Sequence, residues 1–187
     1  MERLSDEQLL RGYLRGDREA LGLLAQRYER LLLGLARGLL NGSNTAALDA
    51  VQETWMRLMR YGKSFDGRSS VKTWLYRITI NQCRDQLHQS RRRDADWKVA
   101  GMNGLEPAVA DRDVSDGLAR AERIESLRLR VAALSERRRE TILLCYHEGL
   151  THEQVAEVLE IPLGTVKSRL NAALEALRAT FDEPVNT

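Results

Sequence analysis

The stretch GLTHEQVAEVLEIPLGTVKSRL, residues 149–170, predicts two short helices separated by a tight turn. Thr151 is followed three residues later by Gln154, the pattern of a capping box, in which side chains satisfy free amide groups at a helix start. The second helix begins near Pro162, a residue type that suits the first turn of a helix. Two short helices joined by a tight turn are typical of a helix-turn-helix.

The second of these helices, expected to continue to about Phe181, has two different faces. At 100° per residue, one side collects the apolar residues Val166, Leu170, Ala173, Leu174 and Leu177. The opposite side and its flanks carry short polar side chains and two cations, which suit a helix lying in the major groove of DNA. The other interpretation is an amphipathic helix that only packs in a bundle. The candidate DNA-contacting residues are Thr165, Lys167, Ser168, Arg169 and Asn171.

Composition extends the helical prediction to the whole chain of 187 residues. Aromatic residues are 5% and there are only 3 prolines, a balance that favours helices over strands. Two cysteines are too few for a disulfide framework. No segment has the apolar length of a signal peptide or a membrane span. We therefore expect an all-α, reduced, cytoplasmic protein with no membrane insertion of its own.

The N-terminal half predicts one domain of four helices over residues 1–93. A capping box at Ser5 opens the first helix, and longer runs of helical periodicity follow. The third helix, expected from about Ala46 to Arg60, would carry Leu48, Val51, Trp55, Leu58 and Met59 on its apolar side. A fourth is expected from about Val71 to Arg91.

Between the two helical regions the periodicity fades, which predicts a flexible acidic linker over residues 94–124. From Asp94 to Ser126 there are eight acidic residues against four basic ones, which is typical of a solvated tether. The helix-turn-helix domain would then cover residues 125–181. The predicted fold is two small helical domains joined by this linker.

The strongest basic patch lies in the first domain. Residues 68–93 contain seven lysines or arginines against Asp85 alone, interleaved with Trp74 and Tyr76. Cations and aromatic rings together suit single-stranded or locally opened nucleic acid, where bases stack on the rings. The alternative is that Trp74 belongs to the core and that the arginines are a solvated helix end. By contrast, the net charge of the whole chain is only +2, so overall charge points to no particular partner.

Catalysis and metal binding are not expected. Asp49, Gln52 and Glu53 share one face of the third helix, but no nucleophile, histidine or glycine-rich loop accompanies them. That face is either a protein-docking surface or simply solvated. Cys83 and Cys145 are far apart in sequence, no histidine or cysteine spacing fits a metal site, and nothing indicates a cofactor.

Three segments, which follow one another along the chain, resemble those of a known family, the bacterial sigma factors of the extracytoplasmic-function (ECF) type. DAVQETW at residues 49–55 resembles the segment with which the family binds core RNA polymerase. TWLYRI at 73–78, followed by Asn81, Asp85 and the arginines 91–93, is similar to the helix that reads the –10 promoter element. Residues 149–170 resemble the helix-turn-helix that reads the –35 element. The resemblance covers nearly the whole chain.

The resemblance implies a transcription initiation factor rather than an enzyme. Its partners would be core RNA polymerase through the beta-prime clamp, promoter DNA as duplex at –35 and melted strand at –10, and an anti-sigma factor. The polymerase-binding residues would be Asp49, Gln52, Glu53 and Trp55. The –10 residues would be Lys63, Arg68, Ser69, Ser70, Lys72, Trp74, Arg77, Asn81 and Arg84. Those for –35 would be Thr165, Lys167, Ser168, Arg169 and Asn171.

Two departures from the family pattern and one alternative accompany this prediction. Residues 171–174 are Asn-Ala-Ala-Leu where the family often has an arginine-rich patch, and Ala46 and Ala47 stand where it usually has an acidic residue. The alternative is a regulator that binds DNA through its helix-turn-helix without polymerase. That alternative is disfavoured by the charge of residues 135–178, where six basic residues face seven acidic ones, because phosphate attraction supplies much of DNA affinity.

Overall fold

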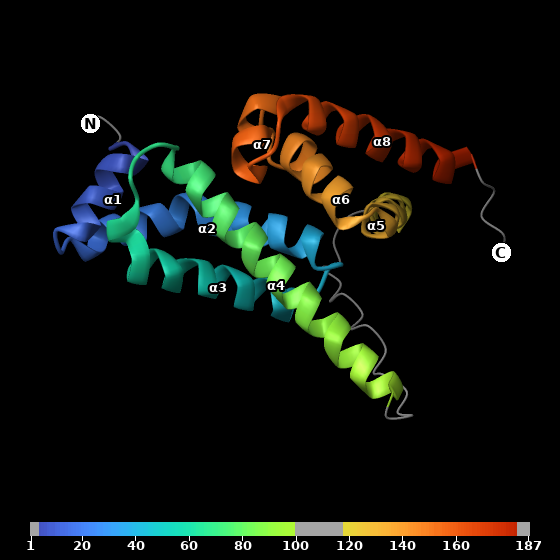
Figure 1. Ribbon diagram of the computed structural model, residues 1–187, viewed down its shortest axis with the longest axis horizontal. Helices are drawn as coiled ribbons and strands as arrows, with labels where there is room; N and C mark the ends of the chain where they lie inside the picture. The colour runs from blue at the N-terminus through green and yellow to red at the C-terminus, as the bar shows by residue number, and fades with distance from the viewer. Residues whose placement is uncertain (1–3, 100–117, 183–187) are drawn as a thin grey trace.

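The computed structural model describes residues 4–99 and 118–182, and all regular structure in these ranges is helical (Figure 1). The expected all-α class is therefore confirmed for the described chain. The first four helices are α1 (Asp6–Leu14), α2 (Arg18–Leu39), α3 (Asn44–Tyr61) and α4 (Val71–Val99), with a 3-10 turn, η1 (Gly62–Ser64), after α3. The C-terminal helices are α5 (Leu118–Ala133), α6 (Glu136–Ile142), the π-helical turn η2 (Leu143–His147), α7 (His152–Leu159) and α8 (Leu163–Asp182).

The helix starts follow from local side-chain chemistry. Both predicted capping boxes are present, because Ser5 and Gln8 exchange hydrogen bonds at the start of α1, as do Thr151 and Gln154 at the start of α7. The predicted helix-turn-helix is α7 and α8. Between them Glu160 adopts a left-handed conformation with φ of 55°, which ends α7 sharply.

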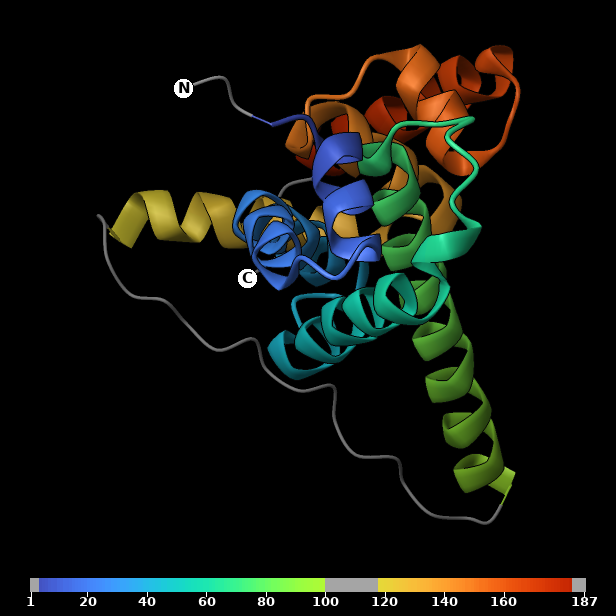
Figure 2. The same cartoon turned by 90° about the vertical axis from the view of Figure 1, so that its left-hand side faces the viewer.

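α4 is longer than predicted. It continues to Val99 and so enters the range assigned to the linker, and Figure 2 shows its C-terminal end extending away from the other helices. At the other end of that range, α5 begins at Leu118. The middle of the predicted linker, residues 100–117, lies outside the described residues.

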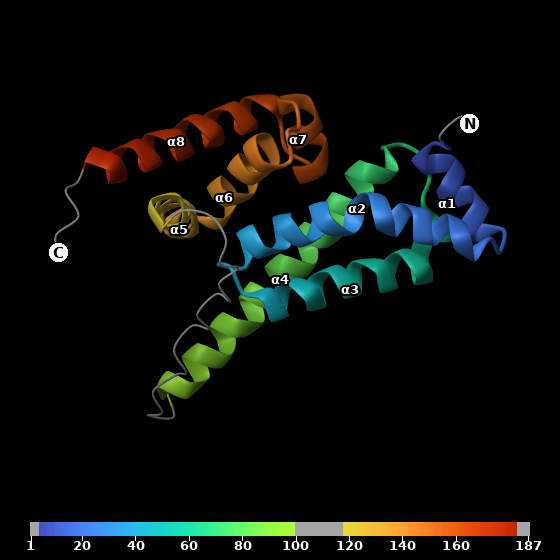
Figure 3. The same cartoon turned by 180° about the vertical axis from the view of Figure 1, so that it is seen from behind.

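The two groups of helices pack against each other. α2 lies between α3 and the C-terminal helices, so α3 is on the far side of the N-terminal domain (Figure 3). One buried apolar cluster contains Leu32 and Leu35 of α2 together with Val155 and Val158 of α7. A second, smaller cluster is confined to the C-terminal helices and consists of Leu134, Ile142, Leu170, Ala173 and Leu177. The larger core is therefore shared between the two domains.

Candidate protein and nucleic-acid interfaces

The outer face of α3 combines carboxylates with exposed apolar side chains. Asp49 and Gln52 are exposed, and half-buried Glu53 pairs with Arg57 at 3.4 Å between Nε and Oε1. The prediction that Leu48 and Met59 face inward was wrong, since their exposed fractions are 50% and 47%. The buried face of α3 consists instead of Ala47, Ala50, Val51, Thr54 and Leu58.

An apolar surface bordered by charged groups is typical of a protein-docking site. Met56, which is also exposed, extends the apolar part of this face. The fourth residue predicted here, Trp55, is half-buried and packs against the core. Its Nε1 atom is buried and has no hydrogen-bond partner among the described residues.

The loop before α4 and the first turn of α4 form a second surface. Phe65 and Trp74 pack together with ring centroids 5.3 Å apart, and both contact the core. Ser70 caps α4, because its Oγ accepts a hydrogen bond from the amide of Thr73 at 3.0 Å. Among the other predicted residues of this segment, Lys63, Arg68 and Ser70 are exposed, whereas Ser69 and Lys72 are half-buried. This loop thus presents hydroxyls and cations beside an aromatic pair.

Further along α4, two of the predicted –10 residues, Arg77 and Arg84, contact the C-terminal domain. The Arg84 guanidinium binds both carboxylate oxygens of Glu140, with Nε donating to Oε1 at 2.6 Å and Nη2 donating to Oε2 at 2.8 Å. This hydrogen-bonded carboxylate raises the pKa of Arg84. Asn81 is exposed and accepts a hydrogen bond from Arg84 at 3.2 Å. Arg77 donates to the carbonyl of Glu157 at 2.8 Å.

Tyr76 does not belong to the aromatic patch in which the sequence placed it. It is fully buried, and its hydroxyl donates to Oε2 of Glu148 at 2.5 Å. The Glu148 side chain is itself 0% exposed, and its other oxygen lies 2.7 Å from Nδ1 of His147. Burial and the hydrogen bond to Glu148 raise the pKa of Tyr76 above its usual range. Tyr76 therefore joins the two domains and is not available for stacking on bases.

α8 presents the polar face that the sequence predicted. Val166, Leu170, Ala173 and Leu177 are buried, which confirms the predicted apolar side. On the other side the candidate DNA-contacting residues reach the surface: Lys167, Ser168 and Asn171 are exposed, and Thr165 and Arg169 are half-buried. The Ser168 hydroxyl donates to the Thr165 carbonyl at 3.0 Å. This face remains open to a duplex while the domains are packed together.

In the described parts of the chain, no three histidine, cysteine or acidic side chains come together in a way that could hold a metal ion. Within the same ranges, no helix has the length and apolar character needed to cross a bilayer. Cys83 is buried, as expected, and burial raises the pKa of its thiol to about 12. Cys145 is only half-buried.

A helical domain that carries a cationic helix, followed by a helix-turn-helix domain, defines a class of two-domain helical DNA-binding proteins. Comparison with known families makes this specific. Residues 24–93 match the model of sigma-70 region 2, and residues 131–179 match that of sigma-70 region 4.

Full-length relatives agree with the family models. The RNA polymerase sigma-H factor of Pseudomonas aeruginosa is 33% identical over 177 residues, 92% of this chain and 91% of that protein. The ECF RNA polymerase sigma-E factor of Escherichia coli is 31% identical over 181 residues, 94% of each chain. This chain therefore belongs to the sigma-70 family and is an RNA polymerase sigma factor of the ECF type, which acts in transcription initiation.

Two solved structures share the fold. CnrH, solved in complex with the cytosolic domain of CnrY, has a TM-score of 0.69 and 23% identity, covering 95% of this chain and 97% of that one. The sigma factor RpoE of Bartonella quintana, solved with the anti-sigma factor NepR, has a TM-score of 0.67 and 23% identity, covering 89% and 98%.

Proposed function

We propose that this sigma factor binds core RNA polymerase through the outer face of α3, with the beta-prime clamp as its partner. The support is the combination of Asp49, Gln52 and Glu53 with the exposed Leu48 and Met59 on one helix. Apolar side chains supply contact area, and the carboxylates fix the register by pairing with cations. Trp55, half-buried beneath this face, positions the helix.

The loop before α4 and the first turns of α4 are proposed to capture bases of the melted –10 strand. Flipping a base out of the stack costs a few kcal/mol, which stacking and cationic contacts must offset. Trp74 beside Phe65 offers the aromatic surface. The cations and hydrogen-bonding groups proposed to act with it are Lys63, Arg68, Ser69, Ser70, Lys72, Arg77, Asn81 and Arg84.

The exposed side of α8 is proposed to read the –35 duplex in the major groove through Thr165, Lys167, Ser168, Arg169 and Asn171. The proposed domain limits are residues 1–93 and 125–181, with 94–124 as the linker. As a polymerase-associated factor, the protein would act in the cytoplasm and would carry out no reaction of its own. An anti-sigma factor is a further proposed partner, by analogy with the RpoE–NepR complex.

The observation that carries the proposal is the mixed carboxylate and apolar face of α3, where Leu48, Met56 and Met59 stay exposed among the residues that the structure describes. Reconstituted transcription with purified core polymerase and genomic fragments of the source organism tests it. We expect transcript starts that depend on the protein and share a –10/–35 pair. A footprint from the protein alone, with no association with core polymerase, would favour the polymerase-independent regulator instead.

The role of α3 has a direct test. Asp49→Ala combined with Glu53→Ala should lower affinity for core polymerase without unfolding the N-terminal domain, because both side chains lie outside the core. Glu19→Ala combined with Glu29→Ala, two exposed carboxylates of α2, is the matched control. Equal affinities for the two double variants in a purified binding assay would refute the assignment of α3.

A further inference from the structure

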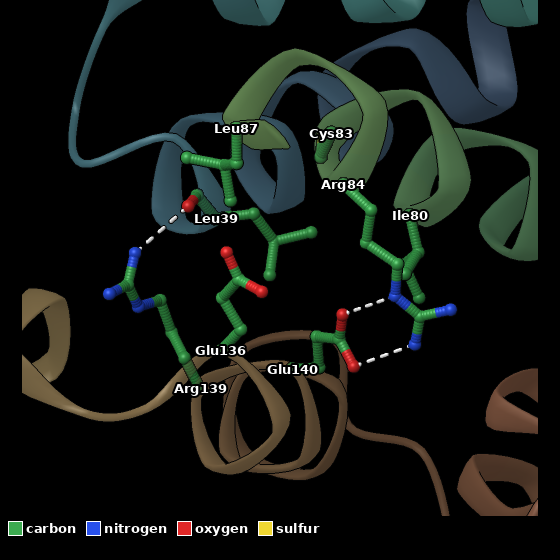
Figure 4. A pocket seen from close by; sticks show the side chains of 8 residues that line it. All are labelled: Leu39, Ile80, Cys83, Arg84, Leu87, Glu136, Arg139 and Glu140. Atoms are coloured by element: carbon green, nitrogen blue, oxygen red, sulfur yellow. Dashed lines mark hydrogen bonds and ion pairs between the residues drawn. The ribbon is translucent and has the colours of Figure 1, made fainter. Parts of the chain in front are cut away.

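Three arginines on one side of α4 each face a carboxylate of the C-terminal domain. Arg77, Arg84 and Arg91 are spaced by seven residues, which places them along one face of a helix. Their partners are Glu160 at 3.0 Å, Glu140 at 2.6 Å and Glu136 at 2.7 Å. We call these three arginines the arginine row. Figure 4 shows its central pair, Arg84 with Glu140, where α4 meets α6.

The pairs differ in strength. Glu140 is only 3% exposed and is held by a two-pronged hydrogen bond, the geometry in which arginine binds carboxylates and phosphates most strongly. The Arg91 side chain is 61% exposed, and the contacted oxygen of Glu136 is not aligned for a hydrogen bond. Glu160, the partner of Arg77, is 67% exposed, so these two outer pairs contribute little. The interface thus depends most on Arg84, which also belongs to the proposed –10 surface.

A second feature brings α2 into the same interface. A Cβ atom added to Gly34 would lie 2.8 Å from Cε1 of His147, and one added to Gly38 would lie 2.8 Å from Cδ1 of Leu143. Glycine inside a helix costs up to about 1 kcal/mol relative to alanine. These two glycines, one helical turn apart, allow η2 of the C-terminal domain to approach the α2 backbone closely. We call them the glycine pair.

We propose that the free sigma factor is self-masked: its C-terminal domain closes on α2 and α4 and occupies the arginines that would otherwise contact the –10 strand. Glu140 and Glu160 take the place of phosphate groups at Arg84 and Arg77. The masking part of this proposal rests on the proposed –10 role of α4. Promoter binding must then release the C-terminal domain, and the apparent affinity for single-stranded DNA falls in proportion to the fraction of open molecules.

A steric wedge tests closure without changing any charge. Gly38→Leu places a side chain against Leu143, whereas Gly22→Leu, on the same helix, meets open space and is the matched control. Neither residue belongs to a proposed DNA-binding surface. We expect Gly38→Leu to increase the radius of gyration in small-angle X-ray scattering. It should also raise affinity for a fluorescein-labelled single-stranded DNA about tenfold, while Gly22→Leu matches the parent chain.

A charge variant gives an independent route to the open state. Glu140→Gln combined with Glu160→Gln removes the negative charges that face Arg84 and Arg77. Most of the effect comes from Glu140, because it is buried and loss of one partner of a desolvated pair weakens an interface strongly. Glu175→Gln, at an exposed site on α8, controls for the change in net charge. Should the buried change at Glu140 prevent folding, Gly38→Leu still tests closure by itself.

The outcomes separate closure from the role of α4 in DNA binding. Expansion together with tighter DNA binding in both the wedge and the charge variants supports the proposal. Unchanged scattering in both overturns closure, whatever happens to DNA binding. Expansion with unchanged DNA affinity overturns masking. In that case the double variant Arg77→Gln with Arg84→Gln decides the role of α4. Weaker binding of single-stranded DNA by this variant supports the proposed –10 role, and unchanged binding refutes it.

Discussion

Arg139 is a charged side chain whose hydrogen bonds all go to uncharged oxygens. It is buried, and its Nη atoms donate to the carbonyls of Leu39 and Leu134 at 3.0 Å each, and also to the carbonyl of Ala132 and the amide oxygen of Asn41. Burial lowers its pKa. One guanidinium therefore connects the end of α2 to the turn between α5 and α6.

Loss of this guanidinium should destabilise the chain. Arg139→Met keeps an apolar stem but leaves buried carbonyls without donors, and we expect the free energy of unfolding in urea to fall by about 2–3 kcal/mol. Arg138→Met, at the exposed neighbouring position, should change it little. Similar losses in the two variants would show that the carbonyl contacts of Arg139 contribute nothing specific.

The thiol of Cys83 should resist modification. The thiolate is the reactive form, and burial, together with the nearby Glu140, raises the pKa of Cys83 to about 12. At mildly alkaline pH we expect a disulfide reagent to label Cys145 first and Cys83 only after unfolding in urea. Cys145→Ser should remove the first phase, and a fast phase that survives in this variant would contradict the prediction.

The same shift has a consequence for stability. The pKa of Cys83 is higher in the folded chain than the value of about 8.5 expected for the unfolded chain. The stability that the buried neutral thiol contributes is therefore complete below about pH 8.5. It is lost as pH rises from about 8.5 toward about 12. Urea unfolding across the lower part of this window should show a steeper loss of stability in the parent chain than in Cys83→Ala.

At the scale of single elements, local signals predicted most of the fold. Capping pairs at Ser5 and Thr151 fixed two helix starts, and apolar spacing identified the buried side of α8. The end of α4 was missed because residues 92–99 have no apolar stripe, yet they contain no glycine or proline to stop a helix. On α3, small Ala47 and Ala50 fill the core while Leu48 faces outward, and sequence alone does not distinguish a side chain facing a partner from one facing the core.

The cap of α7 should contribute measurably to stability. Thr151 accepts a hydrogen bond from the amide of Gln154 at 3.3 Å, and Thr151→Ala should cost about 1 kcal/mol in thermal unfolding. Thr45→Ala, at an exposed position in the first turn of α3, is the control and should have a smaller effect. Equal effects would show that the α7 cap adds nothing beyond ordinary helix propensity.

The polar face of α8 should bind phosphate whether or not the domains are closed. Lys167 is exposed in the closed arrangement, so Lys167→Ala should weaken binding to duplex DNA similarly for all sequences and reduce the slope of log affinity against log salt by about 1. The measurement is a salt titration of duplex binding. Arg178→Ala, near the far end of α8, should leave the slope unchanged, and equal slopes for all three proteins would contradict the assignment.

At the scale of the whole molecule, the sequence predicted two domains but not how they meet. Gly34 and Gly38 lie inside a helical run, and Arg77, Arg84 and Arg91 have an ordinary interpretation as a DNA-binding face. Their partners are at least 45 residues away along the chain, beyond the reach of any local pattern. The seven-residue spacing of the arginines was visible, but it specified a common face without specifying what covers it.

The shared core makes a prediction about cooperativity. Val155 and Val158 of α7 are buried in the same cluster as Leu32 and Leu35 of α2, so unfolding of the C-terminal domain exposes apolar surface of the N-terminal one. Calorimetry of the parent chain should therefore show one main transition, and so should Gly22→Leu. Gly38→Leu separates the domains and should split this into two transitions at lower temperatures, because each domain then unfolds without the other. A single transition in Gly38→Leu, at the temperature of the parent chain, would mean that contacts other than the glycine pair hold the domains together.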